Sequence, residues 1–475
     1  MILHWFRRDL RLEDNPALQA ACRESVGRVV PVFVLSDGRG AHRWTGPARQ
    51  SVLCGSLRAL AEELETAGSR LILRRGDAVQ ELERLLIETR AEALYFNRSP
   101  DPSGRALEAR VETMARRLGV RVQGFHDVTA LPPEAVLTQA GQPFRVFTPF
   151  SRAWLKQTAP APDLRPLQFE QSVAENRARS ARSTLVRLPS LPLPTLADWG
   201  LDAAGLLLPE SGEPAARRRM EAFFDGPIFR YAAERDLPAV DATSRLSADL
   251  RWGALSARLL VQRCHEAVAT AKTAAQRDSA RKYLGELLWR EFYMAILWHW
   301  PEVLEHEFQP RFRGMPWHEP GEAFQRWCEG MTGFPIVDAG MRQLAATGWM
   351  HNRVRMIVAM FLTKDLHLDW RLGEAFFMQR LADGEIASNN GGWQWSAGTG
   401  ADAAPYFRIQ NPWTQSARFD PEGEYIRRWV PELSDTSARS FSKPPTAPLA
   451  PGYPLPMVDH AREREIALAM YRHSA

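Results

Sequence analysis

The sequence predicts an N-terminal α/β domain at residues 1–130, a long connector at 131–195 and an all-helical domain at 196–475. Three observations support this division. Short apolar runs alternate with helical patterns in the first part, prolines interrupt every pattern in the second, and apolar residues recur at helical spacing in the third. A chain of 475 residues is also too long for one ordinary hydrophobic core.

The first domain contains five apolar runs of strand length, at residues 2–6, 29–35, 71–73, 94–96 and 120–123. The run VVPVFVL at 29–35 has no polar residue, which is typical of a parallel strand buried on both faces. Helical patterns separate the runs, and Asn15 and Pro16 suit a helix N-cap and a first helical position. We therefore predict a doubly wound, five-stranded parallel sheet. Neither the GxGxxG motif nor the P-loop motif follows the first strand, which argues against the ordinary dinucleotide and P-loop classes.

Ten prolines lie between residues 132 and 194, and no helical or strand period survives among them. We predict an extended connector that runs over the surface. Beyond it, the spacing of apolar residues predicts helices at 217–224, 257–271, 282–300, 323–328, 337–347, 349–365 and 370–381.

The composition is globular, with 45% hydrophobic and 24% charged residues, and the formal net charge of +4 permits a nucleic-acid partner without requiring one. Only five of the 60 basic residues are lysines, which reflects either GC-rich codon usage or the suitability of arginine for phosphate recognition. The four cysteines are far apart, which argues against a disulfide framework or a zinc site. No signal-peptide pattern or membrane-length apolar run is visible, so we expect a cytoplasmic protein.

The stretch 383–395 (DGEIASNNGGWQW) is the most unusual part of the chain. Its Asn-Asn-Gly-Gly run at 389–392 has turn chemistry, because Asn and Gly tolerate positive φ. Trp393 and Trp395 then alternate, and in extended geometry they point to different sides. Two such large side chains either fill a core or line a site for a flat aromatic group.

Three further groups of residues could carry chemistry. Glu286, Trp289, Arg290 and Tyr293 share one face of a predicted helix, which suits either a pocket wall or a surface ion pair beside partly buried aromatics. Asn352, Arg355, Met356 and Ala359 form a second stripe, whereas the nearby His351 is better explained as a structural residue. The run DATSRLS at 241–247 suits phosphate binding or, equally, helix caps and turns.

Taken together, these segments resemble the DNA photolyase/cryptochrome family. The resemblance covers nearly the whole chain, in the expected order. It is carried by WFRRDLRLEDNPAL at 5–18, DATSRLSADLRWGALSAR at 241–258, LLWREFY at 287–293, TGFPIVDAGMRQLAATGWMHNRVRM at 332–356 and DGEIASNNGGWQWSAGTGADAAPYFRIQNP at 383–412.

The resemblance implies an N-terminal α/β domain and a C-terminal helical domain that binds FAD. The implied FAD-binding residues are Tyr231, Thr243, Ser244, Arg245, Leu246, Ser247, Tyr283, Arg290, Asn352, Arg355, Asp383, Glu385 and Asn389. Arg355 and Asp383 are expected to pair against the isoalloxazine ring, and Asn389 to lie at the flavin N5. Trp393, Trp370 and Trp317 occupy the positions of the family's electron-transfer tryptophans. Glu385 departs from the family pattern, which has Asp at this position.

The family contains repair enzymes and light sensors. The residues that cyclobutane pyrimidine dimer photolyases use against the lesion are matched here by Glu286, Trp289, Trp395, Asn352 and Met356. The resemblance therefore implies an enzyme that repairs UV-damaged DNA by electron transfer from excited, reduced FAD to a flipped-out dimer. It also implies a monomer without an obligate protein partner. Arg235, Arg353 and Arg408 are expected to contact DNA phosphates. The alternative is a cryptochrome-like photoreceptor without repair activity.

A second, antenna chromophore is the least constrained expectation. The run NRSPDPSGR at 97–105 departs from the family's usual pattern and lacks the folate-binding Glu of some members. Trp44 is placed either to stack on an antenna ring or to pack within its loop. A folate (methenyltetrahydrofolate) is slightly favoured over a deazaflavin, and the absence of any antenna is equally compatible with the sequence.

Overall fold

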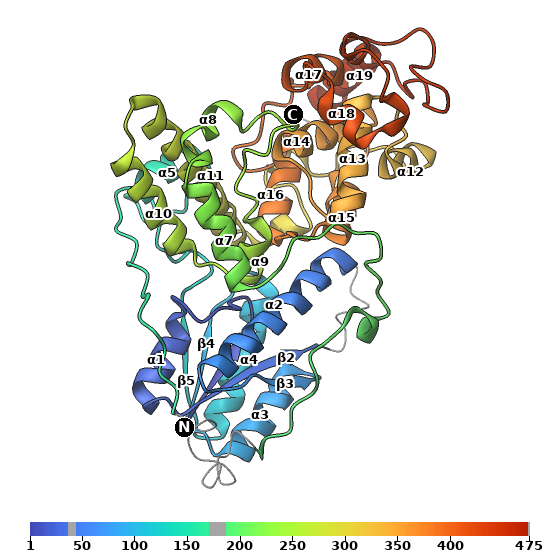
Figure 1. The fold of residues 1–475 in the computed structure, drawn as a ribbon. Helices are drawn as coiled ribbons and strands as arrows, with labels where there is room; N and C mark the ends of the chain where they lie inside the picture. The colour runs from blue at the N-terminus through green and yellow to red at the C-terminus, as the bar shows by residue number, and fades with distance from the viewer. Residues whose placement is uncertain (37–43, 171–186, 474–475) are drawn as a thin grey trace.

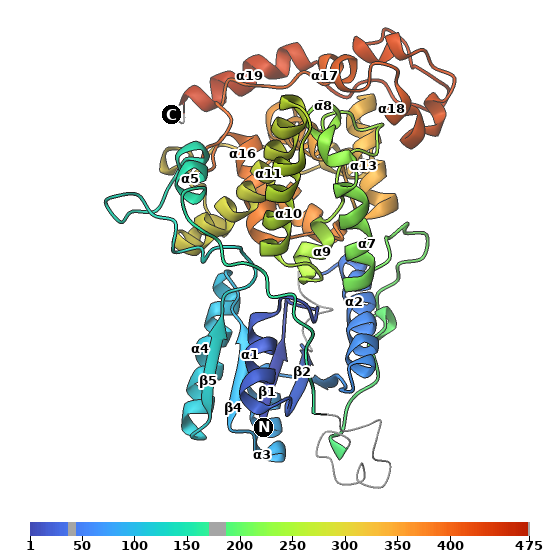
Figure 2. The same cartoon turned by 60° about the vertical axis from the view of Figure 1, so that its left-hand side comes forward.

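The computed structural model describes residues 1–36, 44–170 and 187–473. An α/β domain built from the first part of the chain lies against a larger helical domain, and the C-terminal helices lie on the far side of the helical domain from the sheet (Figures 1 and 2). The predicted combination of an α/β domain and an all-helical domain is confirmed.

The sheet has five parallel strands in the order β3-β2-β1-β4-β5. They are β1 (Ile2–Phe6), β2 (Val29–Leu35), β3 (Ile72–Arg75), β4 (Ala93–Asn97) and β5 (Arg121–Phe125). The doubly wound sheet was predicted, and the bounds of β1 and β2 are those expected from the sequence. The other three strands differ from their predicted bounds by one or two residues, at ends where polar residues such as Arg74 and Arg75 extend the pairing.

Helices cover both faces of this sheet. Ile2 and Phe6 pack on one face with α1 (Pro16–Ser25) and α2 (Pro47–Thr66), whereas Leu3 and Trp5 pack on the other. The second face is covered by α3 (Ala78–Thr89) and α4 (Pro102–Arg117). This division follows from the alternation of side chains along each strand. Asn15 caps α1 as predicted, accepting a hydrogen bond from the Leu18 amide at 3.1 Å.

The predicted connector at 131–195 is not extended throughout. Residues 147–154 form α5 (Phe147–Trp154), a helix that was not predicted, in which Phe150 and Trp154 are buried in the core of the helical domain. The spacing of Phe147, Phe150 and Trp154 is helical, but the prolines around these residues obscured it. Residues 171–186 of the connector lie outside the described part of the chain, and the domain limits at 130 and 195 remain predictions.

From residue 196 onward, the described chain is helical apart from loops and an isolated bridge between His318 and Leu368. Its longest helix is α11 (Ala274–His299). The α-helices around it are α7 (Glu213–Phe224), α8 (Tyr231–Glu234), α9 (Ser247–Trp252), α10 (Ala257–Thr270), α12 (Glu322–Glu329), α13 (Pro335–Thr347), α14 (Asn352–Met360), α15 (Trp370–Arg380), α16 (Ile386–Ala397), α17 (Pro412–Phe419), α18 (Glu424–Trp429) and α19 (His460–His473).

Short helical turns connect these α-helices. They are η3 (Leu196–Trp199), η4 (Pro227–Phe229), η5 (Pro301–Leu304), η6 (Pro310–Phe312), the π-helical η7 (Phe361–Asp365), η8 (Pro431–Leu433) and η9 (Ala438–Ser442). All seven predicted helical segments are present, but the one at 349–365 is divided. It begins only at Asn352, where the His351 side chain caps α14 by accepting from the Arg353 amide at 3.2 Å, and it ends in η7. None of the described helices has the length and apolar character needed to cross a bilayer.

The helical domain has two hydrophobic cores. One is formed by α5, α7, α10 and α11, and the other by α12 to α18 together with η7. Helix α16 contacts both α11 and α15, so it lies where the two cores meet. This junction positions the candidate site described below.

A buried charge cluster joins the α/β domain to the helical domain. Asp127 accepts a hydrogen bond from Arg11 at 3.0 Å and another from Arg258 of α10 at 2.8 Å. Arg258 also donates to Asp14 at 3.1 Å, and all four side chains are buried. Burial alone raises the pKa of Asp127, but the charges of Arg11 and Arg258 outweigh burial and lower it below its usual value. The carboxylate is therefore ionised at neutral pH and fixes the two domains relative to each other.

We expect Asp127→Asn to destabilise the protein by about 3–5 kcal/mol, because it leaves two buried guanidinium groups without their shared carboxylate. The measurement is the urea concentration at the midpoint of unfolding at pH 7. Because the pKa of Asp127 is lowered in the folded state, its stabilisation is present at neutral pH and is lost as the pH falls through that lowered value. Asp278→Asn, which removes an exposed ion pair with Arg281, is the control and should change the midpoint little. Equal midpoints for Asp127→Asn and wild type would contradict the role of the cluster.

Candidate active site

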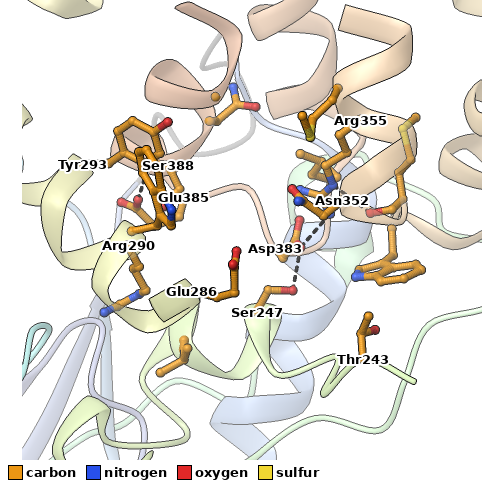
Figure 3. Close-up of a pocket in the computed structure, with 18 of the residues that line it drawn as sticks. Thr243, Ser247, Glu286, Arg290, Tyr293, Asn352, Arg355, Asp383, Glu385 and Ser388 are labelled. Atoms are coloured by element: carbon orange, nitrogen blue, oxygen red, sulfur yellow. Dashed lines mark hydrogen bonds and ion pairs between the residues drawn. The ribbon is translucent and has the colours of Figure 1, made fainter. Parts of the chain in front are cut away.

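A cavity of about 540 Å³ opens where the two cores of the helical domain meet. Its walls come from α8, the loop 243–246, α9, α11, α14, α15 and α16. Figure 3 shows lining residues from the loop 243–246, α9, α11, α14 and α16. This volume is within the range of pre-formed small-molecule sites. The cavity therefore collects residues that lie more than 160 positions apart in the sequence, from Tyr231 to Ser396.

The run Asn-Asn-Gly-Gly at 389–392 lies inside helix α16, so the predicted turn is wrong. Glu385 caps this helix, accepting a hydrogen bond from the Ser388 amide at 2.8 Å. Gly391 is needed for packing, since a Cβ on it would lie 2.1 Å from the Tyr293 ring of α11. At Gly392 a Cβ would meet no atom within 4 Å, so the missing side chain leaves open space on the cavity wall.

Trp393 and Trp395 point to different sides, as predicted, although the reason is helical rather than extended geometry. Residues two positions apart in the sequence point about 200° apart around a helix axis. Trp393 is buried, and its ring lies so close to Gly373 of α15 that a Cβ there would be 2.0 Å from it. Trp395 is half-buried and lines the cavity.

Asp383 connects three elements at one side of the cavity. Its Oδ2 accepts a hydrogen bond from Ser247 at 2.6 Å and forms an ion pair with Arg355 at 2.8 Å (Figure 3). The predicted Arg355–Asp383 pair is therefore present. Oδ1 of Asp383 is buried and has no hydrogen-bond partner within the described residues, which leaves an acceptor for a donor group of a ligand.

Glu385 does not occupy this side of the cavity. While Oε2 caps α16, Oε1 lies 3.3 Å from Nη2 of Arg8, which follows β1 in the α/β domain. Burial alone raises the pKa of Glu385, but Arg8, the Ser388 amide, Arg251 and Arg290 together lower it. The residue that departs from the family pattern thus joins the α/β domain to the N-terminus of α16.

The predicted face of α11 does point into the cavity, with Glu286, Trp289, Arg290 and Tyr293 on its wall. Trp289 stacks on Phe147 of α5, with ring centroids 3.8 Å apart and an interplanar angle of 8°. Arg290 donates to the Val128 carbonyl at 2.7 Å. These contacts fix the orientations of two of the four side chains.

Two of the arginines predicted to contact DNA are already paired in the structure. Arg235 donates to Glu286 at the cavity wall, and Arg353 forms an ion pair with Asp236 at 2.8 Å. Arg408 lies outside the cavity and is exposed.

All of the residues predicted to bind FAD line this one cavity. They are Tyr231, Thr243, Ser244, Arg245, Leu246, Ser247, Tyr283, Arg290, Asn352, Arg355, Asp383, Glu385 and Asn389. Glu286, Trp289, Trp395 and Met356, predicted to face the lesion, line it as well, as does Trp393.

Trp370 and Trp317 lie away from the cavity wall. Trp370 is buried on α15, one turn before Gly373, on which Trp393 packs, and its indole donates to Glu307 at 3.2 Å. Trp317 is half-buried beside Tyr471, with ring centroids 6.2 Å apart. Trp393 thus lines the cavity, Trp370 is fully buried and Trp317 is partly exposed.

Arg251, Lys282, Trp349 and Ser388 also line the cavity but were not predicted. Arg251 could have been found, because it follows Ser247 by four residues and therefore shares its face of α9. Trp349 could not, since it lies in the irregular segment between α13 and α14, where the Arg245 guanidinium lies 4.8 Å from its ring centroid.

Two family models match long parts of this chain. Residues 2–168 match the model described as DNA photolyase, and residues 283–473 match the FAD binding domain of DNA photolyase. The chain belongs to the DNA photolyase family. The second match covers the cavity residues from Tyr283 to Ser396.

Full-length relatives agree with this assignment. The chain is 39% identical to the deoxyribodipyrimidine photo-lyase of Synechococcus sp., over 99% of this chain and 96% of that one. The crystal structure of a bacterial class III photolyase from Agrobacterium tumefaciens matches with a TM-score of 0.87 and 39% identity, covering 100% and 97% of the two chains. A Synechocystis cryptochrome matches with a TM-score of 0.86 and 28% identity, covering 99% of each.

The residues of the cavity fit FAD. The hydroxyl groups of Thr243, Ser244 and Ser247 suit phosphate and ribityl oxygens, and the open wall at Gly392 admits a flat ring. The buried acceptor Oδ1 of Asp383 is available to a ring N–H group or a ribityl hydroxyl.

We expect Asp383→Asn to weaken FAD binding at least ten-fold, because the amide removes the charge that pairs with Arg355 and a charge-assisted hydrogen bond contributes about 1.5–3 kcal/mol. Flavin fluorescence titration of the apoprotein gives the Kd. Asp163→Asn, which changes a carboxylate paired with Arg165 near the surface, is the control. An unchanged Kd for Asp383→Asn would show that Asp383 has no part in FAD binding.

Proposed function

We propose that this protein repairs cyclobutane pyrimidine dimers in UV-damaged DNA by light-driven electron transfer from bound, reduced FAD. One observation carries the proposal. The five residues that match the family's lesion site, Glu286, Trp289, Asn352, Met356 and Trp395, line the same cavity as Asp383 and Asn389. A dimer and a flavin held by these residues share one cavity, as electron transfer between them requires.

The lesion must leave the duplex to reach this cavity, and a dimer is extruded more easily than a normal base because its stacking is weakened. Trp289 and Trp395 supply apolar walls for it. Phe147 stacks behind Trp289 and holds that wall in place before DNA arrives. Arg353 and Arg408 contact phosphates beside the lesion, which makes binding depend on salt.

Glu286 is placed to hydrogen-bond the pyrimidine edge and to stabilise charge that develops on the dimer. In the free protein its carboxylate is paired with Arg235. When a phosphate attracts Arg235, the Glu286 carboxylate becomes available to the pyrimidine. The Arg235–Glu286 pair thus links DNA binding to the preparation of the lesion site.

FAD, when bound in its reduced form and excited by light, supplies the electron that splits the dimer. The protein orients the ring and excludes water from it. Asn389 donates through Nδ2 to the Glu374 carbonyl at 3.1 Å, which leaves its Oδ1 to accept from an N–H group in the cavity. Trp393, Trp370 and Trp317 form the path along which electrons reach oxidised FAD from the outside.

A cryptochrome-like photoreceptor is the second candidate, favoured by the structural similarity to the Synechocystis cryptochrome. The match of all five lesion-site residues favours repair. We also propose a cytoplasmic monomer that needs no protein partner, to be tested by light scattering of the purified protein. A folate antenna is ranked slightly ahead of a deazaflavin, and a protein without an antenna is ranked equally with one that binds an antenna. The absorption spectrum of the purified protein distinguishes the three.

The decisive assay uses UV-irradiated oligothymidine and reduced protein, in light and in darkness. Recovery of intact thymine in light alone is expected. If light and darkness give the same result while FAD is bound, the protein is a photoreceptor or another kind of flavoprotein.

In the same assay, Glu286→Ala should lower the repair yield roughly ten-fold, the factor expected for one lost hydrogen bond to a charged group. FAD should remain bound, which the flavin spectrum shows. Glu266→Ala, on the exposed face of α10, is the matched control. Release of FAD from Glu286→Ala would mean that Glu286 supports the cofactor rather than the lesion.

Trp393→Phe should strongly slow photoreduction of oxidised FAD, because phenylalanine is much harder to oxidise than tryptophan. Repair by protein reduced beforehand with dithionite should change little. Transient absorption after a laser flash measures the first process, and Trp300→Phe is the control. Photoreduction at the wild-type rate would assign the electron path to other residues.

A further inference from the structure

Glu385 lies close to three guanidinium side chains. Figure 3 shows Glu385 and one of them, Arg290, at the side of the cavity opposite the Asp383–Arg355 pair. Arg8 lies 3.3 Å from Glu385, and Arg251 donates to the carbonyl of the adjacent Gly384 at 2.8 Å. Arg290 lies on the same side and lines the cavity together with Arg251 and Glu385. We call Arg8, Arg251, Arg290 and Glu385 the Glu385 cluster.

The Glu385 cluster has more positive than negative charge. Arg8 is shared between Glu385 and Asp101, whose carboxylate lies 3.5 Å away. Arg251 lies within 4.0 Å of no carboxylate among the described residues, although Glu385 and Asp101 attract it from farther away, and its Nη1 is buried without a hydrogen-bond acceptor there. The acid nearest to Arg290 is Glu291 at 4.0 Å, which already accepts hydrogen bonds from the Ala130 amide and the Trp154 indole.

The local electrostatics agree with this imbalance. Burial, followed by repulsion from Arg8 and Arg49, lowers the pKa of Arg251, and burial lowers that of Arg290. A guanidinium group keeps its proton even so, because its pKa lies so far above neutrality. Negative charge arriving in the cavity would therefore be attracted to this wall.

FAD gains negative charge on its ring when it is reduced to the anionic form, whereas its phosphates keep the same charge. We propose that the Glu385 cluster favours the reduced form of the bound flavin, with Arg251 as its principal cation and Glu385 as the residue that holds Arg8 and the N-terminus of α16 in position. This inference rests on the proposed function only in requiring that FAD occupy the cavity. It assigns part of the control of the flavin to Arg8, a residue of the α/β domain.

The inference also gives a reason for glutamate at position 385. One carboxylate oxygen caps α16 while the other reaches Arg8 across the domain boundary. The additional methylene group, compared with aspartate, lengthens the reach of a side chain that has to meet both partners.

The test is the two-electron reduction potential of bound FAD, measured by spectroelectrochemistry, together with the Kd of oxidised FAD. We expect Arg251→Gln to lower the affinity for reduced relative to oxidised FAD about ten-fold, which corresponds to a potential about 30 mV more negative. Arg8→Gln should shift the potential in the same direction by less, because Arg8 does not line the cavity. Glu385→Gln should shift it in the opposite direction, a reversal that general loosening of the site would not produce.

Arg219→Gln is the matched control, since Arg219 pairs with Asp249 of α9 at 2.6 Å but does not line the cavity. Its potential should equal that of wild type. Equal weakening of both redox states by Arg251→Gln would make Arg251 a phosphate ligand and overturn the proposal. Shifts of one sign in all three cluster variants would overturn it as well. If the wild-type protein binds FAD but does not repair dimers, while the variants show the expected shifts in potential, only the proposed function is overturned.

Discussion

The structure depends on buried charge at the boundary between its two domains. Asp127 holds Arg11 of the α/β domain and Arg258 of the helical domain, and all three side chains are nearly inaccessible to water. Such a group is costly to bury and costly to break, so it fixes one arrangement of the domains rather than adding much net stability. Gly253 shows how close the contact is, because a Cβ at this position would lie 2.0 Å from the Arg8 carbonyl oxygen.

That fixed arrangement has a direct effect on the cavity. Arg8 and Arg11 belong to the same short loop after β1. Arg11 pairs with Asp127 in the buried charge cluster, and Arg8 pairs with Glu385 at the start of α16. Helix α16 in turn carries Asn389, Trp393 and Trp395. The α/β domain therefore helps to position the candidate flavin-binding and lesion-binding residues, although all of the residues found to line the cavity belong to the helical domain.

Much of the fold could be predicted because its signals are local. The apolar run at β2 and the cap at Asn15 are determined by residues next to each other in the sequence. The cavity residues were found through long motifs rather than through spacing alone. Two local predictions failed or fell short where tertiary contacts decide the outcome. The Asn-Asn-Gly-Gly run is helical because Glu385 caps it and Tyr293 packs on Gly391, and α5 forms among prolines because Trp154 has a core to enter.

The electrostatic role of Glu385 lay beyond the sequence for a similar reason. Its partner Arg8 is 377 positions away, and nothing local distinguishes an acid that faces a flavin from one that faces an arginine. The same limit applies to Arg251. That its Nη1 lacks a hydrogen-bond acceptor follows from the tertiary positions of the loop after β1 and of helix α16, which the sequence around Arg251 does not determine.

Helix α5 has a consequence for how this protein can be divided. The buried carboxylate of Glu291 in α11 is satisfied from the connector, by the amides of Ala130 and Leu131 and by the indole of Trp154. Phe147, from the same segment, covers the outer face of Trp289. A helical domain cut at residue 196 would lose the hydrogen-bond donors of the buried Glu291. It would also lose Phe147, which packs on Trp289 in the cavity wall. The smallest unit that can keep this cavity intact begins before residue 130, so the segment between the domains is, in folding terms, a part of the second one.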